Sequence, residues 1–155
     1  MSAEFEYLSP DDKPALLALC NAEWQASVEA IVKQLGYKTH AVTTPEDFLA
    51  RFSAVQYQLT VMDELFCAAS LAENTALQSL QVMPMNNRRH TMVILIGDSF
   101  QTGNPMQAFQ QSVHAVVNRA DAGNLAAIIQ KTAGDNEMFL NTFLTTQRRI
   151  AEGKA

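Results

Sequence analysis

Five short apolar runs alternate with amphipathic stretches along most of this chain. Several of the runs are continuously hydrophobic, which is typical of strands buried on both faces in a parallel sheet. Strands that alternate with helices predict right-handed crossovers and an α/β fold with helices on both faces of the sheet. The strands are expected at residues 15–20, 37–42, 59–62, 92–96 and 115–117.

Helix signals lie between these runs. Residues 23–35 carry one apolar stripe, and Gly36 follows as a stop. Thr44 and Pro45 mark another start, with Thr44 as the N-cap and Pro45 in the first turn. Three further helices are expected over residues 70–82, 103–111 and 121–131, the last of them ended by Gly134.

The chain of 155 residues fits one domain with short flanking segments. Residues 1–13 are polar and acidic, and closely spaced prolines after Ser9 predict an irregular lead-in. The domain itself is expected over residues 14–134. Residues 135–155 are surplus to it and predict an extra C-terminal helix with a broad apolar face.

Charge and composition exclude several classes of function. The chain has 11 Lys and Arg against 16 Asp and Glu, a net charge of −5, which gives no general attraction to nucleic acid or anionic lipid. No apolar run approaches the roughly 20 residues that span a membrane, and no secretory signal is visible, so a cytoplasmic protein is expected. Two cysteines cannot build a disulfide framework or a four-cysteine zinc site.

In a parallel α/β sheet, function gathers outside the carboxyl ends of the strands. The residues predicted at that edge are Cys20, Asn21, Glu23, Asp63, Glu64, Gly97, Asp98, Asn118 and Arg119. They include several acids but no glycine-rich phosphate loop after the first strand.

Four segments, by their order and spacing, resemble a response-regulator receiver domain of the CheY-like superfamily. They are residues 16–23 with 34–37, residues 57–63, residues 92–97, and residues 115–121 with 124–125. The resemblance covers residues 14–133 and implies a flavodoxin-like (βα)5 fold, a parallel sheet of order 2-1-3-4-5 with the extra C-terminal helix added to it. It also implies that Asp63 is equivalent to the family's phosphoacceptor aspartate.

The other positions of the family's phosphorylation pocket are degenerate. Leu19 and Cys20, or Cys20 and Asn21 if the following loop is one residue shorter, stand where the family has two magnesium-binding acids, and Gly97 stands at its Thr/Ser. Asn118 replaces the lysine that neutralises the phosphoryl group, and Ala115 replaces the aromatic switch residue. Phosphoryl transfer depends on positioning and charge neutralisation, so we expect inefficient phosphorylation of Asp63. The resemblance is therefore to the atypical, pseudo-receiver branch, in which the fold binds proteins.

We therefore predict a module of bacterial signal transduction that is not an enzyme, needs no cofactor and binds a protein partner or output module. A homodimer is also expected. The predicted partner surface includes Met106, Phe109, Arg119, Phe139 and Phe143. An apolar face outside the core must be buried, so the last helix folds back on its own domain, connects as a signalling helix to another module, or forms a dimer seam. We expect the dimer seam, because a lone projecting helix of this length is only marginally stable in water.

Two alternatives remain. The first is a working receiver that phosphorylates Asp63 with magnesium held by unusual acids such as Glu23, Glu64 or Asp98. The second is a nucleotide- or flavin-binding protein on the same fold. Asp63 could also simply cap a local turn at the end of its strand.

The remaining reactive side chains favour plain structural roles. Cys20 and Cys67 are expected to be small buried side chains, with a redox pair as the alternative. His40, His90 and His114 lie on separate elements without metal-ligand spacing.

Overall fold

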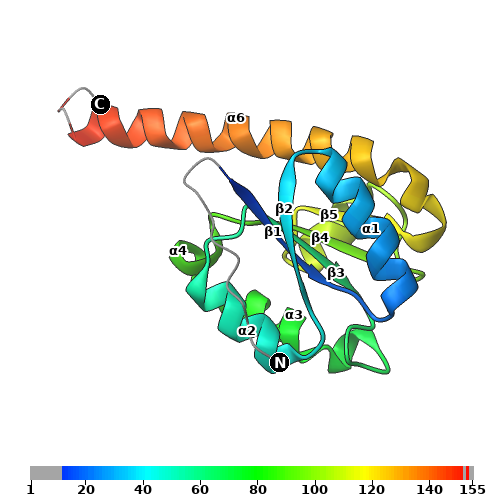
Figure 1. The fold of residues 1–155 in the computed structure, drawn as a ribbon. Helices are drawn as coiled ribbons and strands as arrows, with labels where there is room; N and C mark the ends of the chain where they lie inside the picture. The colour runs from blue at the N-terminus through cyan, green and yellow to red at the C-terminus, as the bar shows by residue number, and fades with distance from the viewer. Residues whose placement is uncertain (1–11, 152, 154–155) are drawn as a thin grey trace.

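A computed structural model describes residues 12–151 and 153 of the chain, without the side chains of residues 137–144 and 147. Its strands form one parallel sheet in the order β2-β1-β3-β4-β5 (Figure 1). This confirms the predicted flavodoxin-like α/β fold and its strand order. The strands are β1 (Lys13–Ala18), β2 (Tyr37–Val42), β3 (Leu59–Asp63), β4 (Met92–Gly97) and β5 (Ala115–Asn118).

Helices cover the two faces of the sheet (Figure 1). The α-helices are α1 (Ala22–Gln34), α2 (Pro45–Ala54), α3 (Thr75–Val82), α4 (Met85–Arg88), α5 (Pro105–Gln110) and α6 (Leu125–Ala151). Two 3₁₀ helices, η1 (Leu71–Glu73) and η2 (Arg119–Asn124), precede α3 and α6.

The continuously apolar strands contribute side chains to the cores on both faces of the sheet, because successive side chains point to opposite sides. On β1, Leu16 and Ala18 belong to the core that includes Phe48 of α2 and Leu77 of α3. Ala15 and Leu17, which alternate with them along β1, belong to the core on the opposite face, which includes residues of α1 and α6. All of β3 and β4 is buried, as expected for central parallel strands.

The predicted start of α2 is confirmed. The Asp47 amide donates to Oγ1 of Thr44 at 3.1 Å, and Pro45 is the first helical residue. Gly36 also follows α1 as predicted, with a φ of 93° that an L side chain would strain. Local sequence chemistry therefore fixes these helix ends.

Three predicted boundaries are corrected. β1 ends at Ala18, so Cys20 lies in the following loop rather than on the strand. The helix expected over residues 70–82 is split into η1 and α3 at Asn74, whose side chain caps α3 by accepting from the Leu77 amide. The predicted loop before β4 contains the short helix α4.

The helix end predicted at Gly134 is also wrong. α6 runs for 27 residues from Leu125 to Ala151, which is about 40 Å. A glycine inside a helix costs about 1 kcal/mol relative to alanine, which does not stop a helix whose first turns are anchored in a core. Leu125 and Ile129 provide that anchor, being 0% and 1% exposed. Beyond them α6 extends away from the sheet (Figure 1).

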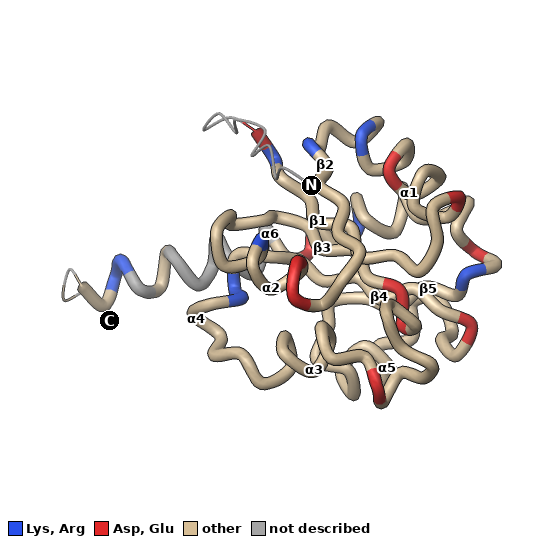
Figure 2. Tube along the Cα trace, turned by 60° about the horizontal axis from the view of Figure 1, so that its bottom comes forward, with Lys and Arg blue, Asp and Glu red and all other residues tan. Residues whose placement is uncertain are grey.

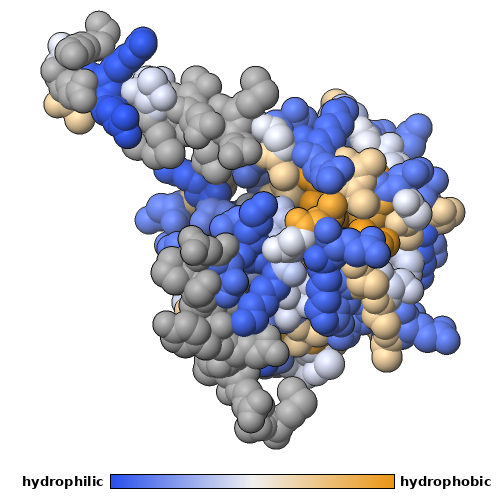
Figure 3. All heavy atoms as spheres, turned by 45° about the horizontal axis from the view of Figure 1, so that its top comes forward, coloured by the Kyte–Doolittle hydropathy of each residue, from blue (hydrophilic) through white to orange (hydrophobic). Residues whose placement is uncertain are grey.

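The surface is polar and mixed in charge. Acidic and basic residues are interspersed over the described part of the chain, and Arg148 and Arg149 lie near the end of α6 (Figure 2). On the face shown in Figure 3, an apolar patch is bordered by hydrophilic residues. No helix in the described ranges combines the length and the hydropathy that crossing a bilayer requires.

Candidate functional site

Asp63 is the centre of the predicted site and lies at the carboxyl end of β3. Its side chain is 0% exposed, yet it is well supplied with hydrogen-bond donors. The Leu65 amide donates to Oδ1 at 2.8 Å, and the Cys20 thiol donates to Oδ2 at 3.2 Å. The contact with Leu65 is the turn-capping role that was one of the interpretations of this residue.

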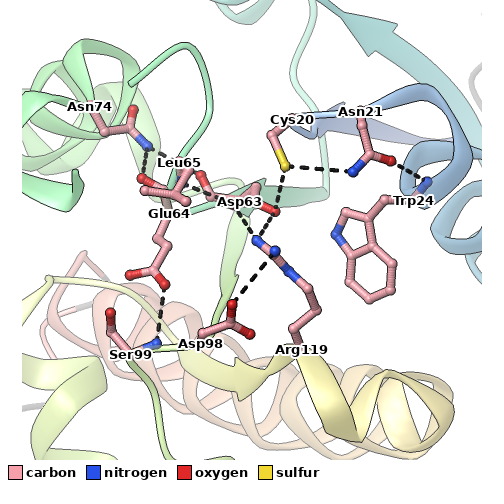
Figure 4. Close-up of polar contacts among 10 residues, drawn as sticks. All are labelled: Cys20, Asn21, Trp24, Asp63, Glu64, Leu65, Asn74, Asp98, Ser99 and Arg119. Atoms are coloured by element: carbon pink, nitrogen blue, oxygen red, sulfur yellow. Dashed lines mark hydrogen bonds and ion pairs between the residues drawn. The ribbon is translucent and has the colours of Figure 1, made fainter. Parts of the chain in front are cut away.

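Arg119 supplies the charge that balances Asp63. Its Nη2 lies 3.1 Å from Oδ1 and 2.8 Å from Oδ2 of Asp63 (Figure 4). With Leu65 and Cys20, the carboxylate thus accepts four hydrogen bonds from the chain itself. An ionised carboxylate has about four positions that can accept a hydrogen bond. In Asp63, donors of the protein itself occupy these positions.

Further contacts hold the guanidinium in this position. Nη1 of Arg119 lies 3.7 Å from Oδ2 of the exposed Asp98, and the guanidinium carbon lies 6.0 Å from the centroid of the Trp24 ring. Burial would lower the pKa of the Arg119 guanidinium, but the charges of Asp63 and Asp98 outweigh burial and raise that pKa. Arg119 is therefore a permanent cation in the pocket.

Cys20 and Asn21, which the resemblance places at a magnesium-binding acid position, supply no carboxylate. Cys20 and Cys67 are both exposed, which contradicts the expectation of two buried side chains. Partial burial of the Cys20 thiol and its hydrogen bond to Asp63 raise the pKa of Cys20, so it is held as a neutral donor. Asn21 caps α1 by accepting from the Trp24 amide at 2.7 Å.

Glu64 is a second buried carboxylate that the sequence argument did not distinguish. It is 4% exposed, and its Oε1 accepts from the Ser99 amide at 3.1 Å. Its side chain occupies the space where a Cβ at Gly97 would lie. Position 97 therefore lacks a hydroxyl for a packing reason: Glu64 fills the volume that a Thr or Ser side chain would need.

Asn118 has a structural role at this edge of the sheet. Its amide nitrogen donates to the Phe100 carbonyl at 2.9 Å, and its Oδ1 accepts from the Ala120 amide at 2.9 Å. The side chain thus fixes the loop after β4 to the turn after β5. It does not point a charge at Asp63.

The residues at this edge do not fit a magnesium ion. Mg²⁺ requires octahedral oxygen ligands and is usually held by carboxylates. Here Cys20 and Asn21 take the acid positions, and the one matching carboxylate, Asp63, is engaged by a guanidinium. Among the described residues no group of three His, Cys, Asp or Glu side chains could hold a metal, and the three histidines are not brought together.

At Ala115, the position of the aromatic switch, the side chain is small and a cavity adjoins it. The cavity of about 550 Å³ lies between α5, β5 and α6. Its lining includes Ala108, Ala115, Ile128 and Lys131. Open, partly apolar space therefore adjoins the small side chain at position 115.

The predicted partner residues fall into three groups. Met106 and Phe109 on α5 are 62% and 81% exposed. Arg119 turns its guanidinium toward Asp63 (Figure 4). The side chains of Phe139 and Phe143 lie outside the described residues.

Arg119 lies at the predicted edge of the sheet, but its side chain pairs with Asp63 instead of facing a partner. The available signal was its position directly after β5, where a cation faces the end of β3 in a parallel sheet. For Glu64 there was no comparable signal, because burial of its carboxylate depends on Gly97, which lies on another strand.

Solved structures share this fold. A receiver domain of a sensor histidine kinase from Pseudomonas aeruginosa, determined with magnesium in its active-site cleft, is 19% identical with a TM-score of 0.62, over 79% of this chain and 98% of that chain. A CheY-like receiver domain from Methanospirillum hungatei is 15% identical with a TM-score of 0.63, over 82% and 98%. An orphan response regulator of H. pylori is 16% identical with a TM-score of 0.59, over 77% and 95%.

No protein-family model matches the sequence, and no curated protein matches it significantly. At identities of 15 to 19%, the likeness to solved structures establishes the receiver-type fold. The chemistry of the site rests on the residues of this chain.

Proposed function

We propose that this chain is an atypical receiver domain of bacterial signal transduction that acts by binding proteins and is not efficiently phosphorylated. The observation that carries the proposal is the pairing of Asp63 with Arg119. In the fold position of a phosphoacceptor, the carboxylate is 0% exposed and already accepts four hydrogen bonds from three groups, the Leu65 amide, the Cys20 thiol and Nη2 of Arg119.

The pairing opposes phosphorylation in two ways. Attack on a phosphoryl donor needs a free carboxylate oxygen, and freeing one would break hydrogen bonds to a charged group, each worth about 1.5–3 kcal/mol. The transition state also needs cations aligned with the phosphoryl oxygens. The pocket offers no magnesium-binding acid pair, and its one arginine is committed to Asp63 and Asp98.

Two features support a protein-binding role. Phe109 and Met106 expose large apolar side chains on α5, beside the cavity that adjoins Ala115. Ile150, near the end of α6, is 63% exposed. Exposed aromatic and methionine side chains are enriched at protein interfaces, so we assign α5, β5 and α6 as the contact surface and expect a cytoplasmic homodimer.

The phosphorylation claim is tested with a small-molecule phosphodonor and Mg²⁺, read by intact mass. We expect no stoichiometric phosphate adduct under conditions that fully phosphorylate a conventional receiver domain run in parallel. A stoichiometric adduct that disappears in Asp63→Asn would overturn the proposal in favour of a working receiver.

The dimer claim is tested separately by light scattering. The full chain should have twice the monomer mass, and the double variant Phe139→Asp/Phe143→Asp should be monomeric with unchanged circular dichroism. The matched control is Val82→Ser, which removes an exposed apolar side chain on α3, outside the assigned surface. If the double variant on the last helix stays dimeric, the assignment of the seam to that helix is wrong.

A further inference from the structure

Both cysteines of the chain line one cavity at the carboxyl edge of the sheet. The cavity has a volume of about 350 Å³, and its lining also includes Thr43 and Leu65. Cys20 follows β1 and Cys67 follows β3. Both residues are exposed, so a small solute can reach either thiol.

Strand order brings the two thiols together from distant parts of the sequence. β1 lies between β2 and β3, yet the Cys67 thiol donates to the carbonyl of Thr43, the residue after β2, at 2.9 Å. The loop after β3 therefore crosses the end of β1. Ala18, at the end of β1, is in register with Val42, at the end of β2, so Cys20 lies in the loop after β1 at the same edge of the sheet as Thr43.

The backbone at Cys67 is unusual. Its φ is 50°, in the left-handed region that few non-glycine residues adopt. This conformation accompanies the contact of its thiol with the end of β2. The Cys20 thiol, on the other side of the cavity, is held by Oδ2 of Asp63 at 3.2 Å.

We propose that Cys20 and Cys67 form a reversible intramolecular disulfide across the end of β1 when the protein meets a low-molecular-weight disulfide oxidant. One cysteine thiolate attacks the oxidant's S–S bond, forms a mixed disulfide and releases one equivalent of thiol. The second cysteine then attacks the mixed disulfide, which forms the Cys20–Cys67 bond and releases the second equivalent. The protein loses two protons and two electrons, and the oxidant gains them as it is reduced to two thiols.

The reaction changes the site described above. Once oxidised, Cys20 no longer donates to Asp63, whose remaining donors are Leu65 and Arg119. Partial burial raises the pKa of both thiols, assisted at Cys20 by Asp63 and at Cys67 by the charge of Glu46. Since the thiolate is the attacking species, the disulfide should form faster at pH 8.5 than at pH 7.

The test treats the full chain with oxidised and reduced glutathione at several ratios, followed by acid quenching, alkylation and mass analysis. We expect a mass loss of two hydrogens, no alkylation of either cysteine, a cross-linked tryptic peptide pair containing Cys20 and Cys67, and reversal by dithiothreitol. Cys20→Ser and Cys67→Ser should each give at most one glutathione adduct and no mass loss.

Three results would overturn the disulfide: glutathione adducts that persist on both cysteines, a disulfide between two chains, or free thiols at every ratio. The redox step does not require that Asp63 be silent toward phosphodonors, so its outcome and that of the phosphorylation assay are independent.

Discussion

Glu64 occupies the volume beside Gly97 that any larger residue at position 97 would need. The carboxylate is 4% exposed and accepts a hydrogen bond from the Ser99 amide. One buried side chain thus explains why position 97 has no room for a side chain. The two residues form one packing unit across neighbouring strands.

This packing unit predicts non-additive stability. Gly97→Ser should lower the free energy of unfolding by about 1–3 kcal/mol, because overpacking a filled core forces neighbours to move. The cost should shrink when Glu64→Ala is present in the same chain, since the truncated side chain leaves room for serine. Urea unfolding of the two single variants and the double variant measures the coupling. Additive effects would show that the two side chains do not compete for space.

The pairing of Asp63 with Arg119 predicts a second coupling. Arg119→Gln should destabilise the fold by about 1–3 kcal/mol, because it leaves the buried carboxylate without its countercharge. In a chain that already carries Asp63→Asn, Arg119→Gln should lower the free energy of unfolding much less. A double-mutant cycle in urea isolates this difference. Lys33, which pairs with Glu29 on the surface of α1 at 2.8 Å, provides the matched control, and Lys33→Gln should change stability by less than about 0.5 kcal/mol.

The continuity of α6 through Gly134 predicts a stabilising substitution. A Cβ at position 134 would meet nothing within 4 Å, and the backbone there is not in the left-handed region. Gly134→Ala should therefore raise helix content and stabilise the protein by up to about 1 kcal/mol. Gly36→Ala is the contrasting control and should destabilise, because φ at Gly36 is 93°. A destabilised Gly134→Ala variant would indicate a helix break at that residue.

His90 predicts a loss of stability in acid. Burial lowers the pKa of His90 from its ordinary 6.5, and its Nε2 is buried without a hydrogen-bond partner in the described structure. The ring lies 5.4 Å from that of Phe52. A histidine whose pKa is lower in the folded state than in the unfolded state binds more protons when the protein unfolds. Its contribution to the free energy of unfolding is therefore fully present above pH 6.5 and is lost as the pH falls from there toward the folded pKa.

The measurement is urea unfolding of the native chain and of His90→Phe between pH 7.5 and 5. The variant should lose less stability over this range than the native chain. The pH dependence of stability should not vanish in His90→Phe, because burial and the charge of Arg88 also lower the pKa of His114. An identical pH dependence in both proteins would contradict the role of His90.

Much of the fold follows from local sequence patterns. Continuous apolar runs identified the strands that are buried on both faces, and Thr44, Pro45 and Gly36 marked helix ends through contacts within a few residues. The prediction at Gly134 failed because helix termination is decided by the balance of packing and propensity, and the anchored turns at Leu125 and Ile129 outweigh a single glycine.

By itself, the sequence determined the α/β class and the set of residues at the carboxyl edge of the sheet, because periodicity and strand ends are local properties. Tertiary structure alone decided what those residues do. Asp63 and Arg119 are 56 positions apart, and Glu64 excludes a side chain at Gly97 only because β3 and β4 are neighbours. Ion pairs and excluded volume depend on distances across the fold, and the order of residues along a chain does not contain those distances.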